Sequence, residues 1–156
     1  KSRFPEYVAR QISNIFPDVV IRGEELFPYI GIALERMEHS VLHNVRIKYF
    51  KDGKDIIFNH LHTDQYAMFL YLLCNTIFRK EGDLVLATKI YALNKAMHAI
   101  DVHYHVLLPD VFLFSHPVGT VLGPAKYSNY FAVHQNLIIQ HIPFLEFFQN
   151  CVFWLF

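Results

Sequence analysis

Apolar residues recur at helical spacing in the first hundred positions of the chain. One stretch holds four of them, three or four positions apart with charged side chains between: Ile30, Leu34, Met37 and Val41. This spacing places the apolar side chains on one face of an amphipathic helix. Because proline lacks an amide hydrogen and is tolerated at the start of a helix, we expect this helix to begin near Pro28.

Two further helices are expected next. The first has Thr63 or Asp64 as its N-cap, ends before Gly82, and has one apolar face formed by Tyr66, Phe69, Leu70, Leu73 and Ile77. The second has Asp83 as its cap. Its buried side holds Leu86, Ile90, Leu93 and Met97, and its two lysines, Lys89 and Lys95, are expected to point elsewhere.

Between the first helix and these two, alternating residues predict a β-hairpin. Apolar and basic residues alternate over 45–49, the turn-forming residues Lys51-Asp52-Gly53-Lys54 follow, and residues 56–58 return as the partner strand.

The pattern changes after Asp101, where apolar residues fall six positions apart. Two such series run through this part of the chain: Val102, Leu108 and Phe114, and Val106, Phe112 and Val118. A period of six fits neither a helix nor a single strand. It is typical of a hexapeptide β-helix, in which each hexad forms a short strand and a turn, so that about three hexads close one coil.

Composition narrows the class of protein. The 156 residues are enough for one domain, 53% are hydrophobic, 18% are charged, and 14 basic residues balance 14 acidic ones. Disorder and a basic nucleic-acid surface are therefore not expected. The two cysteines, Cys74 and Cys151, are too few for a disulfide framework and favour a reducing compartment.

One pair of residues has the spacing of a general base and its partner. His116 follows Asp101 by fifteen residues, which is nearly one coil of a six-residue-period β-helix. A carboxylate that accepts the Nδ1 proton of a histidine leaves Nε2 free to act as a base. The alternative is that Asp101 ends the preceding helix and His116 only hydrogen-bonds within a turn.

From about Leu84 to Gln135 the chain resembles the serine acetyltransferase family of hexapeptide-repeat acyltransferases. The resemblance is carried by Asp101-Val102-His103-Tyr104, by His116 and by Gly119-x-x-x-Gly123, in the order and spacing of the family's motifs. It implies an α+β fold: a mainly α-helical region with a β-hairpin over 1–100, the start of a short, incomplete left-handed parallel β-helix over 101–136, and an atypical apolar and aromatic tail over 137–156.

The resemblance also implies a reaction. An acetyl group passes from acetyl-CoA, as co-substrate, to the hydroxyl of a small molecule, with L-serine the expected acceptor, as in cysteine biosynthesis. His116 is then the general base, Asp101 its orienting carboxylate, and His103 a residue near the acceptor. No metal is expected. The family implies a cytoplasmic homo-oligomer, based on a trimer where the β-helix is complete enough, with neither nucleic acid nor membrane as a partner.

Two departures from the family bear on these expectations. Ser115 stands where the family often has an aspartate before its catalytic histidine, and Pro117-Val118 replaces the usual small residues, so acceptor binding is expected to differ. Gly123 is the last glycine, whereas family members continue through further glycine-bearing hexads. We therefore hypothesise a C-terminally truncated or frame-shifted member. Its acetyl-CoA site is incomplete unless the aromatic tail or self-association covers the open end of the β-helix.

Other functions stay open. The chain is alternatively a non-catalytic oligomerising or interaction module, or an acetyltransferase that acts on a sugar. The pairs His60/His62 and His103/His105 have a spacing that suits zinc or copper on an extended strand. Lys126 and Tyr127 are candidates for contact with CoA, or are simply exposed coil positions.

Overall fold

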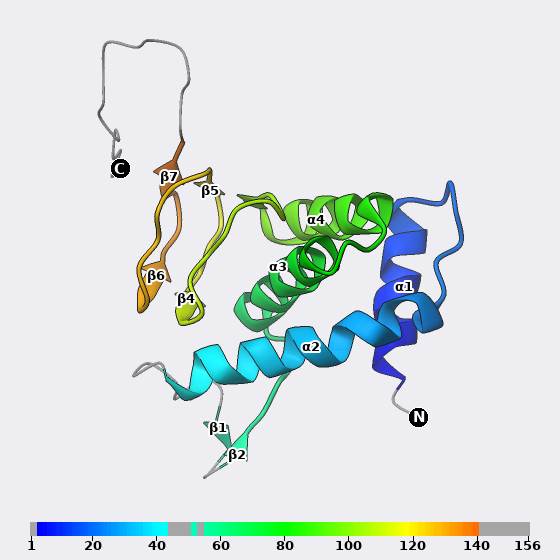
Figure 1. The fold of residues 1–156 in the computed structure, drawn as a ribbon, viewed down its shortest axis with the longest axis horizontal. Helices are drawn as coiled ribbons and strands as arrows, with labels where there is room; N and C mark the ends of the chain where they lie inside the picture. The colour runs from blue at the N-terminus through cyan, green and yellow to red at the C-terminus, as the bar shows by residue number, and fades with distance from the viewer. Residues whose placement is uncertain (1–2, 44–50, 53–54, 141–156) are drawn as a thin grey trace.

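The computed structural model describes residues 3–43, 51–52 and 55–140, and within them the chain is a mixed α+β protein. Four helices pack together at one end of the molecule, the short strands over 112–139 stack at the other, and a separate strand pair over 51–56 lies beside the helices (Figure 1). The helices are α1 (Phe4–Ile15), α2 (Gly23–Leu42), α3 (Thr63–Arg79) and α4 (Leu84–His98).

Helix α3 forms the centre of the hydrophobic core. It packs against both α2 and α4, and every side chain from Gln65 to Ile77 is buried. The sequence predicted one apolar face, but a helix enclosed by neighbours is buried all round. Burying each large apolar side chain stabilises the fold by roughly 1.5–3 kcal/mol, so this helix is the main source of hydrophobic stability.

The start of α3 differs from the prediction. His62 occupies its N-cap position, and no side chain caps the helix. Neither Thr63 nor Asp64 therefore has the capping role expected from the sequence. The carboxylate of Asp64 binds another part of the chain instead, the amide of His116.

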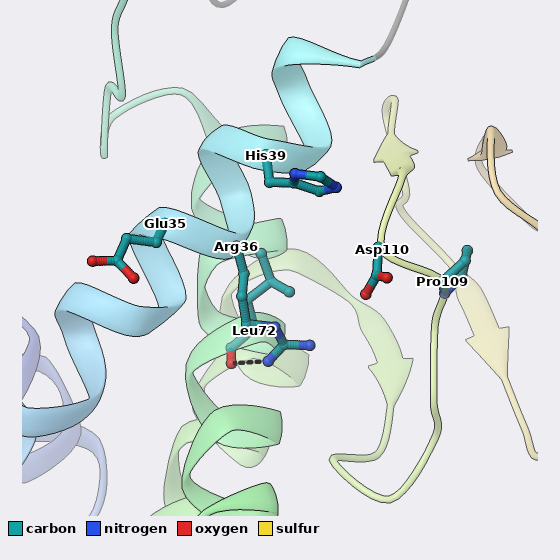
Figure 2. Close-up of a pocket in the computed structure, with 6 residues that line it drawn as sticks. All are labelled: Glu35, Arg36, His39, Leu72, Pro109 and Asp110. Atoms are coloured by element: carbon teal, nitrogen blue, oxygen red, sulfur yellow. Dashed lines mark hydrogen bonds between the residues drawn. The ribbon is translucent and has the colours of Figure 1, made fainter.

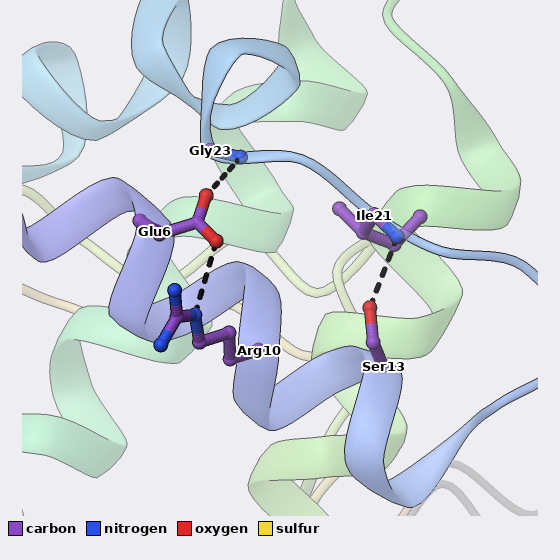
Figure 3. Close-up of polar contacts among 5 residues, drawn as sticks. All are labelled: Glu6, Arg10, Ser13, Ile21 and Gly23. Carbon is purple, nitrogen blue, oxygen red and sulfur yellow. Dashed lines mark hydrogen bonds and ion pairs between the residues drawn. The ribbon is translucent and has the colours of Figure 1, made fainter.

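Helix α2 begins five residues earlier than predicted, at Gly23, so that Pro28 lies inside the helix. Its beginning is fixed by α1 (Figure 3): the amide of Gly23 donates to Glu6 Oε2 at 3.2 Å, and the amide of Ile21 donates to Ser13 Oγ at 3.0 Å. A Cβ on Gly23 would lie 2.8 Å from the backbone nitrogen of Glu6, so only glycine fits this close approach.

Helix α4 confirms one prediction and corrects two. Asp83 caps it as expected, accepting hydrogen bonds from the amides of Val85 and Leu86 at 2.7 and 3.3 Å. Lys89, expected to point away from the core, is only 8% exposed and its Nζ lies 2.6 Å from Asp18 Oδ1. Met97, expected to be buried, is 43% exposed. Met97 therefore lies on the exposed face of the last turn of α4, whereas His98 in the same turn is buried.

The predicted hairpin is present in a shorter form. Strands β1 (Lys51–Asp52) and β2 (Asp55–Ile56) pair antiparallel, with Lys51 opposite Ile56. Two residues expected in the turn, Lys51 and Asp52, thus belong to the first strand. The predicted strand over 45–49 lies outside the described residues.

Beyond α4, residues 99–140 form five short strands that pair in parallel: β3 (Ile100–Val102), β4 (Phe112–Phe114), β5 (Thr120–Leu122), β6 (Phe131–Val133) and β7 (Ile138–Ile139). One sheet has the order β3-β5-β7, and β4 pairs with β6. Strands β3, β4 and β5 each pair with a strand that lies 17–20 residues further along the chain. Ile100 is opposite Thr120, Phe112 is opposite Phe131, and Val121 is opposite Ile138. The chain therefore winds in successive coils.

Most residues of the six-residue pattern are buried in these coils. Five of its six members are 9% exposed or less, namely Val102, Val106, Leu108, Phe112 and Phe114. The sixth, Val118, is 58% exposed. The β3-to-β5 coil spans twenty residues, so a strict six-residue register does not hold through the turn that carries Val118.

Polar contacts join the helices to the coils. Ser40 on α2 donates through Oγ to the carbonyl of Phe112 at 2.8 Å and accepts from the amide of Phe112 at 3.0 Å. On α3, the hydroxyl of Tyr71 donates to the carbonyl of Val106 at 2.7 Å. These buried bonds fix the coils against the helical core.

Among the described helices, none combines the length and apolar character needed to cross a membrane.

Candidate functional site

His116 lies on the turn between β4 and β5. Its backbone adopts a left-handed conformation with φ of 51°, which is uncommon for a residue other than glycine. Neighbouring coils hold the turn on both sides: the amide of Ser115 donates to the carbonyl of Val133 at 2.9 Å, and the amide of Gly119 donates to the carbonyl of Ala99 at 2.9 Å. The backbone around His116 is thus fixed independently of its side chain.

Gly119 is required by the shape of this turn. Its φ is +73°, and a Cβ there would lie 2.5 Å from Oδ1 of Asn136 in the next coil. Glycine tolerates both the conformation and the close approach. The Gly-x-x-x-Gly motif therefore has a structural reason at its first position, where two coils come together.

Asp64, in the first turn of α3, is the carboxylate that reaches His116. Its Oδ2 accepts a hydrogen bond from the backbone amide of His116 at 3.0 Å and lies 3.8 Å from the imidazole Nδ1. The side chain of Asp64 is 12% exposed, whereas that of His116 is 81% exposed. Nδ1 therefore lies near a largely buried carboxylate, and most of the imidazole is exposed.

His98, at the end of α4, lies near the same carboxylate. It is 8% exposed, and its Nδ1 lies 2.8 Å from Oδ1 of Asn94. Burial lowers the pKa of His98, although the contact with Asn94 and the negative charge of Asp64 oppose that shift. Asp64 thus lies near two histidines, one exposed and one buried.

Asp101 does not meet His116. Its Oδ1 accepts a hydrogen bond from the hydroxyl of Tyr91 at 2.6 Å, and its Oδ2 lies 2.5 Å from Nζ of Lys95. Burial alone acts to raise the pKa of Asp101, but the hydrogen bonds from Lys95 and Tyr91 outweigh it and lower that pKa. Both carboxylate oxygens are engaged on the α4 side of the coil.

The coil length explains why the expected pair is apart. Asp101 lies opposite Val121, twenty residues further on, so His116 is five positions short of the register of Asp101. In a coil of about eighteen residues, His116 would have been only three positions short of the register of Asp101. Two extra residues of extended chain correspond to roughly 7 Å, which is enough to separate the two side chains.

His103 lies with Asp101 and not with His116. Its ring contacts that of Tyr91, with centroids 4.9 Å apart, and its Nδ1 accepts a hydrogen bond from the amide of His105 at 3.3 Å. Burial, and then the neighbouring His105, lower the pKa of His103. The sequence-predicted residues therefore separate: His116 lies on one turn, and Asp101 and His103 lie together elsewhere, in contact with Tyr91 of α4.

The histidine pairs considered for metal binding do not form a larger ligand set. Within residues 3–43, 51–52 and 55–140, no three His, Cys, Asp or Glu side chains gather in an arrangement that could hold a metal ion. His60 packs against the ring of Tyr7, with centroids 4.8 Å apart. His105 packs against the ring of Phe78, with centroids 4.3 Å apart.

A separate hollow of about 340 Å³ lies between α2, α3 and the segment before β4 (Figure 2). Within it, Arg36 donates to the carbonyl of Leu72 at 3.3 Å, to Thr76 Oγ1 at 2.7 Å and to Asn75 Oδ1 at 2.8 Å. Burial lowers the pKa of Arg36. Besides Arg36 and Leu72, the hollow is lined by Glu35, His39, Pro109 and Asp110.

Sequence reasoning missed two of these features. It treated Asp64 only as a possible helix cap. The contact with His116 was not predicted because 52 positions separate the two residues. It treated Arg36 as one of the charged residues between apolar positions. For Arg36, the only sequence signal was its position on a helix whose other face is apolar. No sequence signal indicated the contact between Asp64 and His116.

Comparison with known proteins adds no identification. The chain matches no protein family, no curated protein and no solved structure.

Proposed function

We propose that this chain is a CoA-dependent O-acetyltransferase that moves an acetyl group from acetyl-CoA to a small hydroxyl acceptor, with L-serine the first candidate. The observation that carries the proposal is the environment of His116. Its Nδ1 faces the carboxylate of Asp64 at 3.8 Å while the side chain is 81% exposed. A histidine with a carboxylate on one nitrogen and an accessible second nitrogen has the arrangement of a general base.

The winding of residues 100–139 supports the same proposal. Parallel three-residue strands return after 17–20 residues, close to the three hexads per coil of a hexapeptide β-helix. We therefore propose that this region is the beginning of a left-handed parallel β-helix. The motif residues His116 and Gly119 then lie on one turn of it, as the resemblance to serine acetyltransferases implies.

In the proposed reaction, Nε2 of His116 takes the proton of the acceptor hydroxyl while the hydroxyl oxygen forms a bond to the acetyl carbonyl carbon. The tetrahedral intermediate then collapses, the carbon–sulfur bond breaks, and the proton on Nε2 passes to the sulfur of CoA. Backbone amides are the donors that would stabilise the oxyanion. General-base assistance of this kind contributes about 10²- to 10⁴-fold to the rate.

Direct transfer agrees with the state of Cys74. This thiol is fully buried, and burial raises its pKa to about 12. A buried, protonated thiol is a poor nucleophile, so an acetyl-cysteine intermediate at this position is not part of the proposal.

We propose that the active form is a homo-oligomer, because the reactive turn is open. Apolar side chains near it and elsewhere on the coils are exposed: Leu107 at 63%, Val118 at 58% and Tyr130 at 66%. A second copy that covers them would exclude water from His116 and strengthen the electrostatic interactions there. The same exposed residues favour the alternative function, a non-catalytic interaction module.

The test is turnover by the purified chain. CoA release from acetyl-CoA is followed with L-serine and with a panel of sugars, which separates an amino-acid acceptor from a sugar acceptor. The proposal expects acceptor-dependent release that His116→Ala lowers by about 10²-fold or more. The matched control is His43→Ala, since His43 is exposed at the end of α2 and its Nδ1 lies 2.8 Å from the carbonyl oxygen of His39 in that helix.

A folded chain that neither binds acetyl-CoA nor releases CoA would contradict the enzyme proposal. Concentration-dependent self-association in that case would favour the interaction module.

A further inference from the structure

We propose that Asp64 on α3, and not Asp101, is the carboxylate that positions His116 for catalysis. This proposal rests on the proposed function, because it assigns a positioning residue to the base of that reaction. It also connects the helical region to the chemistry, which the sequence motifs place entirely in the coils.

A single oxygen of Asp64 makes both relevant contacts. Oδ2 accepts the backbone amide proton of His116 at 3.0 Å, and the same oxygen lies 3.8 Å from Nδ1 of the ring. The first contact holds the residue in its left-handed backbone conformation, with φ of 51°. Strained backbone of this type is concentrated at functional sites, where surrounding contacts maintain it.

The second contact is longer than a hydrogen bond, as is common for catalytic pairs without substrate. Such pairs tighten when substrate binds, so a separation of 3.8 Å is within the range of a positioning contact. Because the carboxylate is 12% exposed and the imidazole 81% exposed, Asp64 is the fixed partner. A small rotation of the exposed ring is enough to bring Nδ1–H onto Oδ2.

Asp101 is unsuited to this role in the same structure. Its two oxygens already bind Tyr91 and Lys95, at 2.6 and 2.5 Å. Moving Asp101 to His116 would break both contacts and leave the ammonium group of Lys95 without its carboxylate. Asp64, in contrast, has its Oδ2 directed at the turn that carries His116.

Other titratable groups surround this turn. His98 lies near Asp64 at the end of α4, and His134 directly follows β6, where the β4–β6 register places it opposite Ser115, next to His116. Asp64 is the only carboxylate that contacts His116 within the described residues. A carboxylate next to Nδ1 stabilises the Nδ1–H tautomer and leaves Nε2 unprotonated, which is the form a base requires.

The experiment compares Asp64→Asn with Asp101→Asn by ¹⁵N NMR of the His116 imidazole in the full chain, together with steady-state kinetics. Asparagine at position 64 still accepts the amide hydrogen of His116 but carries no charge, so the backbone contact is kept. We expect Asp64→Asn to move the ring from the Nδ1–H toward the Nε2–H tautomer and to lower kcat about 10- to 100-fold, with an unchanged KM for acetyl-CoA.

Asp64→Glu, which restores the charge, should recover part of both signals. Asp110→Asn is the matched control, since Asp110 is exposed at the separate hollow between α2 and α3, and it should leave the tautomer and kcat as in the wild type.

The proposal is overturned if Asp101→Asn shifts the tautomer of His116 and Asp64→Asn does not. It is also overturned if Asp64→Asn lowers kcat with an unchanged tautomer, since that result indicates a structural role. The tautomer needs no turnover to be measured. A wild-type chain that is inactive but shows the Asp64-dependent tautomer therefore contradicts the proposed function and leaves the positioning contact established.

Discussion

The helical region and the coiled region of this protein are stabilised differently. Helix α3 is enclosed by other helices, and thirteen consecutive residues on it are buried. The coils are formed by strands of two or three residues, and several of their apolar side chains are exposed. The turn with His116 belongs to the coiled region, and the carboxylate that contacts it comes from the helical region. The comparison indicates that the helices form the core and also hold a turn of the coils.

The largest expected effect is a difference between two buried leucines. Leu70 on α3 is fully buried and Leu122 on β5 is 2% exposed, so both lose similar side-chain burial on truncation. Replacement by alanine costs about 2–5 kcal/mol, depending on how far the surroundings can collapse into the cavity. We expect Leu70→Ala to lie at the upper end of that range and Leu122→Ala at the lower end, measured by urea denaturation.

The shape of the denaturation curves sharpens this comparison. A separate early transition for Leu122→Ala would show that the coils unfold independently of the helices. Equal losses for both variants in one transition would contradict a difference in stability between the regions.

A smaller effect is expected at a glycine in each region. Gly119→Ala forces a left-handed backbone and a clash with Asn136, which costs about 2 kcal/mol. Gly31→Ala is the matched control, because it lies in α2 and a Cβ there meets nothing within 4 Å. We expect that change to stabilise the protein by about 0.5–1 kcal/mol. Thermal unfolding measures both, and a neutral Gly119→Ala would show that the coils can shift.

The sequence predicted the helical region better than the coiled region. Apolar spacing found the cores of α2, α3 and α4, and Asp83 caps α4 as expected. Spacing did not reveal that α3 is enclosed on all sides, nor that Lys89 is buried beside Asp18, since both depend on which elements pack together. Helix α1 was missed, although Pro5 in its first turn was a usable signal.

The candidate site was only half predictable. The motif placed His116 on a turn, which the structure has, but the partner carboxylate depends on the length of one coil. A β3-to-β5 coil of twenty residues moves His116 out of the register of Asp101, and a residue 52 positions earlier in the chain takes its place beside the imidazole. Periodicity within the coils contains no information about a contact from α3.

The smallest expected effect concerns pH. Burial lowers the pKa of His98, so the folded protein resists protonation there while the unfolded chain takes up a proton below about pH 6.5. The free energy of unfolding should therefore fall as the pH decreases from 7 to 5. His103, whose pKa is also lowered, contributes in the same direction from the coiled region.

We expect His98→Asn to remove about half of this decrease, measured by urea denaturation at the two pH values. The lowered pKa of Asp101 adds a further loss only under more acidic conditions, near the ordinary pKa of a carboxylic acid. A variant with the same pH dependence as the wild type would contradict the role of His98.

Hydrogen exchange at the amide of His116 tests most directly whether a helix side chain holds the turn that carries His116. In the wild type this amide donates to Asp64, whereas the amides of Ser115 and Gly119 donate to backbone carbonyls of neighbouring coils. We expect Asp64→Ala to speed exchange at His116 by roughly tenfold or more, with much smaller changes at Ser115 and Gly119. Equal exchange at His116 in the two proteins would contradict the account.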